Sequence, residues 1–140
     1  MRHVLIVAHQ TLRSPQLREA IADRAAAGPV TFHLVVPMSH GDGFTWNEGQ
    51  VHVEAEHRLE EARLAYLAEG YAVTGEVGDS NPAYAVDNVL RRGDRTSFDE
   101  IVVSTLPSRI SKWMGMDAPA RIRRSTHVTV THLESEIAHH

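Results

Sequence analysis

The chain alternates short apolar segments with longer amphipathic ones. Residues 4–8 form a continuous run of β-branched and other apolar side chains, which is typical of a strand buried on both faces of a parallel sheet. Residues 30–36, 71–77 and 101–103 predict three further strands. The segment from Val128 to Leu133 alternates valine with threonine, and this alternation predicts a fifth strand with one exposed face or a place at the edge of the sheet.

Each segment between these strands carries the signals of a helix. Ser14 and Pro15 are typical first residues of a helix, and Gly70 lies where a left-handed residue is expected to end one. The expected helices run from Pro15 to the Gly28-Pro29 stop, from Val53 to Glu69, from Pro82 to the Gly93-Asp94 stop, and from the N-cap Asp117 to Arg124. The stretch from Met38 to Gln50 has three glycines and no period, so it predicts a long loop.

The alternation of strands and helices predicts an α/β fold, a doubly wound five-stranded parallel sheet sandwiched by helices. A chain of 140 residues is expected to form one domain. We assign residues 1–136 to this domain and residues 137–140 to a frayed tail. The apolar run at residues 4–8 is too short for a signal peptide or a membrane helix, so we expect a cytoplasmic protein without a membrane partner.

Composition and charge narrow the chemistry that the chain can perform. It has no cysteine, which excludes disulfides, a thiol nucleophile and thiolate metal sites. The formal net charge of -4, with no basic stripe, disfavours nucleic acid as a partner. His52 and His57 are five residues apart and therefore face different sides of the predicted long helix, so we predict no metal site.

The candidate ligand site follows from the fold. In an open parallel sheet, ligands bind beyond the carboxyl ends of the strands, where the strand order reverses. His9 could contact a base or a phosphate there, and Asp79 a ribose hydroxyl. Two cations and two hydroxyls after the fourth strand suit a di- or triphosphate. The candidate ligand-binding residues are His9, Gln10, Thr11, Gly78, Asp79, Ser104, Thr105, Ser108, Arg109, Ser111 and Lys112.

Each of these features also has a structural interpretation. The basic loop after the fourth strand could simply be solvated, and Asp79 beside Ser80-Asn81-Pro82 suits a turn and a helix cap. Trp46 and Trp113 could stack on a base or anchor their loops to the core. No G-x-x-x-x-G-K-[ST], G-x-G-x-x-G, G-x-S-x-G or H-E-x-x-H motif occurs, so we predict no catalytic residues and no enzyme.

The order of elements and several local sequences resemble the universal stress protein family. The resemblance covers nearly the whole chain, and its most specific segments are Val77-Gly78-Asp79 and the run from Phe98 to Val103. It implies the strand order 3-2-1-4-5. The ATP-binding members of the family carry an acidic residue after the first strand and a glycine-rich run after the fourth. Here His9 and the stretch from Ser104 to Asp117 stand in these places.

The resemblance implies a non-enzymatic regulatory or stress-response module. Such a module requires no cofactor and binds a nucleotide such as ATP or AMP, or another anionic small molecule, weakly. The resemblance also implies a homodimer formed through the last strand, Val128 to Leu133. Two alternatives stay open. One is an adenine-nucleotide-acting enzyme of the nucleotide α-hydrolase-like fold group, in which Asp79 or Asp117 would act with the basic loop. The other is a purely structural dimeric module.

Overall fold

The computed structural model describes residues 1–38, 48–92, 97–107, 113 and 117–136. Strands and helices alternate along this part of the chain, as the sequence predicts. In chain order they are β1 (Arg2–Val7), α1 (Pro15–Ala27), β2 (Val30–Pro37), α2 (Glu48–Ala68), β3 (Ala72–Gly78), α3 (Pro82–Arg91), β4 (Glu100–Thr105), α5 (Ala118–Ser125) and β5 (Thr129–Glu134). Within the described residues, no helix combines the length and the apolar character that crossing a membrane requires.

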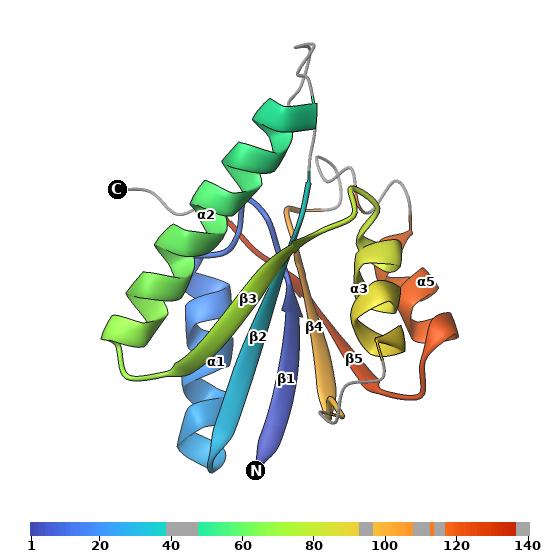
Figure 1. The fold of residues 1–140 in the computed structure, drawn as a ribbon. Coiled ribbons are helices and arrows are strands. Elements are labelled where there is room, and N and C mark those ends of the chain that lie inside the picture. The colour runs from blue at the N-terminus through green and yellow to red at the C-terminus, as the bar shows by residue number, and fades with distance from the viewer. Residues whose placement is uncertain (39–47, 93–96, 108–112, 114–116, 137–140) are drawn as a thin grey trace.

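The five strands form one parallel sheet in the order β3-β2-β1-β4-β5. This confirms the predicted fold class and strand order (Figure 1). β1 lies at the centre, where Val4 is paired with Phe32 of β2 and with Glu100 of β4. The side chains at positions 4–7 are at most 1% exposed, as a continuous apolar run predicts. β5 lies at one edge of the sheet, in agreement with its alternating sequence.

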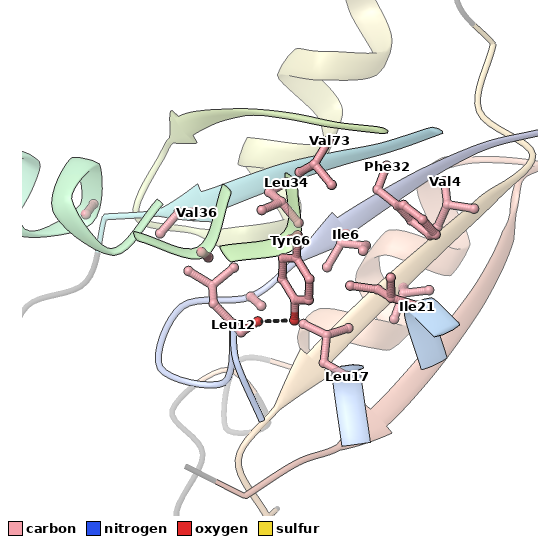
Figure 2. Packing of buried hydrophobic residues seen from close by; sticks show 14 residues of the cluster. Val4, Ile6, Leu12, Leu17, Ile21, Phe32, Leu34, Val36, Tyr66 and Val73 are labelled. Carbon is pink, nitrogen blue, oxygen red and sulfur yellow. Dashed lines mark hydrogen bonds between the residues drawn. The ribbon is translucent and has the colours of Figure 1, made fainter. Parts of the chain in front are cut away.

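Alternate side chains of the sheet pack into two separate cores. Val4 and Ile6 belong to the core that α1 and α2 cover, whereas Leu5 and Val7 belong to the core that α3 and α5 cover. Figure 2 shows the first of these cores, in which Tyr66 of α2 lies among the aliphatic side chains of the sheet and of α1. Helices therefore cover both faces of the sheet, as the doubly wound architecture requires.

The long helix α2 begins at Glu48, before the predicted start at Val53. Val51 is 3% exposed and lies one turn before the buried Ala55, so it extends the buried face of the helix toward its N-terminus. The prediction of a loop from Met38 to Gln50 is therefore wrong at its end. The positions 39–47 of that predicted loop lie outside the described residues.

Two predicted boundaries at the carboxyl ends of strands are also wrong. Gly78 belongs to β3, and Ser104 and Thr105 belong to β4, whereas the sequence predicts that these residues lie in loops. The strands continue because their neighbours do: Gly78 is paired with Pro37 in β2, and Thr105 with Glu134 in β5. Pairing with a neighbour thus lengthens a strand beyond its apolar run.

Asp117 holds the N-cap position of α5, as predicted, but its side chain makes no capping hydrogen bond. Its φ of 54° is left-handed backbone, a conformation that glycine adopts most readily. By contrast, Ser14 caps α1 as predicted, because its Oγ accepts a hydrogen bond from the Leu17 N–H at 3.2 Å. The predicted position of Asp117 at the start of the helix is therefore right, but its side chain does not form the hydrogen bond of an N-cap.

Candidate functional site

The carboxyl ends of β1 and β4 lie side by side at the centre of the sheet, where the strand order reverses (Figure 1). Chain order places β2 and β3 on one side of β1, and β4 and β5 on the other. The structure therefore brings together the predicted residues that follow β1 and those that end β4, which are His9, Gln10, Thr11, Ser104 and Thr105. The predicted Ser108, Arg109, Ser111 and Lys112, and Trp46, lie outside the described residues.

Three buried hydroxyl groups form a chain across this end of the sheet. Thr11 Oγ1 lies 2.7 Å from Ser104 Oγ, which lies 2.8 Å from Ser135 Oγ. These residues are 2%, 1% and 1% exposed, respectively, so the chain of hydroxyls is closed to solvent. The hydroxyl groups of Thr11 and Ser104 are therefore hydrogen-bonded to each other and connect the loop after β1 to β4. Nothing in the sequence points to Ser135 except its place directly after the last strand.

Thr105 uses its hydroxyl in the same way. Its Oγ1 lies 2.7 Å from Nε2 of His132 in β5, and its carbonyl accepts a hydrogen bond from the Ser135 N–H at 2.7 Å. Burial lowers the pKa of His132, while Glu134 opposes this effect and Arg123 adds to it. The neutral imidazole of His132 thus completes a polar layer under the carboxyl end of β4. Its only sequence signal was a histidine inside the valine–threonine alternation.

His9 differs from Thr11 and Ser104 in its hydrogen bonding. The residue is 8% exposed, and neither ring nitrogen has a hydrogen-bond partner among the described residues. Burial, together with the positive charge of Arg58 and against the opposing effect of Glu54, lowers the pKa of His9 to about 4. At neutral pH His9 is therefore uncharged, with one N–H donor and one lone-pair acceptor. It can pair with a neutral polar group but adds no positive charge to the site.

Tyr66 of α2 and Glu69, which directly follows this helix, hold the loop after β1 in place. The Tyr66 hydroxyl donates a hydrogen bond of 2.6 Å to the carbonyl of Leu12, which Figure 2 shows as a dashed line. The Arg13 guanidinium lies 4.4 Å from the centre of the Tyr66 ring and forms an ion pair of 2.8 Å with Glu69. Burial raises the pKa of Tyr66 to about 12, so it stays a neutral donor. The loop that carries His9 is therefore preorganised, with the side chain of Gln10 exposed.

The predicted residues at the end of β3 have structural partners. Asp79 Oδ1 accepts a hydrogen bond of 2.9 Å from the Asn81 N–H, which forms the turn before α3. The Gly78 carbonyl accepts a hydrogen bond of 3.1 Å from the Met38 N–H. A Cβ on Gly78 would lie 2.9 Å from Cβ of Ala85, so glycine allows α3 to pack closely against β3. These contacts fit the turn-and-cap interpretation, and β2 separates both residues from β1.

Other predicted chemistry-bearing residues are also accounted for by packing or pairing. Trp113 is buried in the core covered by α3 and α5, so it anchors its segment. His52 and His57 each pair with the glutamate one turn later on α2, Glu56 and Glu61 respectively. In the part of the chain that the structure describes, no group of three or more histidine or acidic side chains is arranged to hold a metal ion.

The comparisons with known proteins agree with the architecture. The chain matches no family model and no curated protein. Its structure is similar to that of a universal stress protein from Archaeoglobus fulgidus, with 15% sequence identity and a TM-score of 0.61. The match covers 96% of this chain and 94% of that one. The chain therefore has the fold of a universal stress protein over nearly its whole length.

Proposed function

We propose that this protein is a regulatory module of the universal stress protein type, without catalysis of its own. In this proposal it binds an adenine nucleotide or another anionic small molecule weakly at the carboxyl ends of β1 and β4. The observation that carries the proposal is His9, which is buried there with both ring nitrogens unpartnered among the described residues. A buried polar group without a partner costs about 1–3 kcal/mol, and a ligand that fills both positions removes that cost.

The neutral state of His9 favours one part of a nucleotide over another. A heterocyclic base carries both donors and acceptors, so a group on its edge can pair with the N–H or with the lone pair of His9. A phosphate offers acceptors only and would leave the lone pair of His9 unused. We therefore assign the base to His9 and the phosphates to the loop after β4, where Arg109 and Lys112 supply positive charge.

Weak binding follows from the chemistry of that end of the sheet. The hydroxyls of Thr11 and Ser104 are bonded to each other in a buried chain, so they do not hold phosphate. The loop after β4 lacks a glycine-rich run that could wrap phosphate with backbone N–H groups, so its cationic side chains must supply the attraction to phosphate. Exposed charge pairs contribute only about 0–1 kcal/mol each.

ATP and AMP should therefore bind with dissociation constants between micromolar and millimolar, and added salt should weaken the binding. Isothermal titration at low and high salt measures this for the wild type and for the Arg109→Ala/Lys112→Ala double variant, which should bind more weakly. The control is Arg121→Ala/Arg124→Ala, which removes two exposed positive charges from α5. Nanomolar affinity, or equal affinity in the Arg109/Lys112 variant, would place the phosphate site elsewhere.

We also propose a homodimer that forms through β5. The strand lies at the edge of the sheet and pairs with β4 on one side, so its other side presents backbone groups that a second copy can pair. Light scattering at tens of micromolar should give twice the mass of the chain, and Val130→Pro should give a monomer that remains folded, because the alternation of the strand turns the Val130 N–H away from β4. A monomeric mass for the wild type would refute this interface.

A further inference from the structure

A second polar cluster lies away from the candidate ligand site, on β2 and the edge strand β3. His33 Nδ1 lies 2.7 Å from Thr74 Oγ1, and His33 Nε2 lies 2.7 Å from Glu76 Oε1. Val73 and Val77 of β3 pack on the core that α1 and α2 cover. Because side chains alternate along a strand, Thr74 and Glu76 project from the opposite face of the sheet.

The ionisation of Glu76 fixes the direction of the hydrogen bonds. Burial works against ionisation, but hydrogen bonds from Arg92 and His33 together hold the pKa of Glu76 below its usual range. An ionised carboxylate only accepts hydrogen bonds, so Nε2 of His33 carries the proton and donates it to Glu76. In the neutral ring, Nδ1 is then a lone pair, and Thr74 donates its hydroxyl hydrogen to it. The hydroxyl of Thr74 is therefore hydrogen-bonded to a basic nitrogen of His33, and the carboxylate of Glu76 orients the ring of that histidine.

The hydroxyl end of this arrangement is open to solvent. Thr74 is exposed, whereas the side chains of His33 and Glu76 are only 22% and 27% exposed. Arg92 forms an ion pair with Glu76, and the ring of Phe98 lies beside that of His33 with the centroids 6.2 Å apart. The base and the carboxylate are thus held in position, while the hydroxyl that they activate can be reached from outside.

We propose that Thr74 is an activated nucleophile and a site of covalent acylation by activated esters. Thr74 Oγ1 forms a bond to the carbonyl carbon of the ester, and the hydroxyl proton passes to Nδ1 of His33. The bond from the carbonyl carbon to the leaving oxygen breaks, and the leaving group departs as an anion. His33 then returns its proton to solvent. Glu76 acts as a positioning residue because it orients the ring and stabilises the transient imidazolium. The reaction is a single acylation of the chain, and it is independent of the ligand site at His9.

The chain contains an internal control for this proposal. His3 Nδ1 lies 2.6 Å from Thr31 Oγ1, which is the same contact between neighbouring strands. In the described residues, however, no carboxylate forms an ion pair with His3. If the contact between histidine and threonine merely aligned the strands, Thr74 would exceed the half-buried Thr31 in rate only through its greater exposure, and changing His33 or Glu76 would not alter its rate. If the carboxylate of Glu76 makes His33 an effective base, Thr74 alone should react quickly.

The test uses p-nitrophenyl acetate and peptide mapping by mass spectrometry. The chain has a single lysine, Lys112, so Lys112→Arg removes the main competing amine apart from the N-terminus. In that background we expect acetylation of Thr74 at least about tenfold faster than that of Thr31, since a positioned general base typically contributes about 10²–10⁴-fold. Release of p-nitrophenolate should include a phase of one equivalent that Thr74→Val lacks, above the background from the N-terminus and the exposed histidines.

Four variants separate activation from a structural role. Thr74→Val should abolish the adduct, and His33→Gln, which can still hydrogen-bond to both neighbours, should slow it at least about tenfold. Glu76→Gln should also slow acetylation, and Glu76→Asp should restore part of the rate. Circular dichroism and thermal unfolding check that each variant is folded. Acetylation of Thr74 no faster than that of Thr31, or a rate unchanged in folded His33→Gln, would overturn the proposal.

Discussion

Replacing Glu100 with glutamine should lower the free energy of unfolding by about 2–4 kcal/mol, because a charged arginine then stays partly buried without its counterion. Glu100 lies at the start of β4 with its side chain 8% exposed, and that of Arg24 on α1 is 19% exposed. The two carboxylate oxygens of Glu100 accept hydrogen bonds of 2.7 and 2.6 Å from Nε and Nη2 of Arg24. The hydroxyl of Thr131 donates a third hydrogen bond of 2.7 Å to the same carboxylate. Urea unfolding at pH 7 measures the loss.

The control replaces both partners of this pair. Arg24→Met/Glu100→Leu should recover most of the lost stability, because well-packed apolar residues commonly substitute for a buried ion pair without loss. The hydrogen bond from Arg24, which outweighs the opposing effect of burial, holds the pKa of Glu100 below its usual range. The contribution of the pair is therefore complete above the pKa of an unfolded glutamate and is lost as pH falls through the folded-state value. A change below about 0.5 kcal/mol in Glu100→Gln would show that the pair is solvated.

His9→Leu should stabilise the protein, and the stabilisation should grow as the pH falls. At pH 7 the substitution removes a buried imidazole that has no hydrogen-bond partner among the described residues, and this should raise the free energy of unfolding by about 1–3 kcal/mol. The pKa of His9 is lowered from 6.5 to about 4, so the unfolded chain takes up a proton before the folded one does. The folded wild type therefore loses stability as pH falls from about 6.5 to about 4, by about 2–3 kcal/mol in total. The variant lacks this loss.

The measurement is the pH dependence of urea unfolding for the wild type and the variant between pH 4 and 8. A matched control is His57→Leu, which makes the same substitution at a side chain that is 77% exposed on α2. This control should leave the pH dependence unchanged, because it makes the same change of side chain at the surface and leaves the buried ring of His9 in place. Parallel curves for the wild type and His9→Leu would mean that His9 is protonated or partnered in the folded protein.

The sequence predicts those parts of the fold that local pattern determines. The continuous apolar run of β1 indicates its central place, and Ser14 before Pro15 marks the first helix together with its cap. The start of α2 was missed because a single apolar residue, Val51, extends its buried face beyond a glycine-containing segment. Local pattern therefore identifies the elements but not all of their ends.

Interactions between distant residues could not be predicted in this way. Arg24 and Glu100 are 76 positions apart, and His33 and Glu76 are 43 apart, so neither pairing has a local signal. At the candidate site, the fold rule placed His9 and Ser104 at adjacent strand ends. It could not show that the Ser104 hydroxyl is hydrogen-bonded to two neighbouring hydroxyls, or that His9 has no hydrogen-bond partner in the described part of the chain. Both results depend on how α2 and the segment after β5 pack.

If His9 binds the base of a nucleotide, nitrogen-15 spectroscopy of its imidazole should detect the contact. In the free protein at pH 7, the ring should show one protonated and one unprotonated nitrogen, as a neutral imidazole does. Titration with AMP should shift both ring nitrogens of His9 with the dissociation constant that calorimetry gives, and His9→Leu should bind AMP more weakly. Ring nitrogens of His9 that stay unchanged at saturating AMP, or equal affinity in His9→Leu, would contradict the claim.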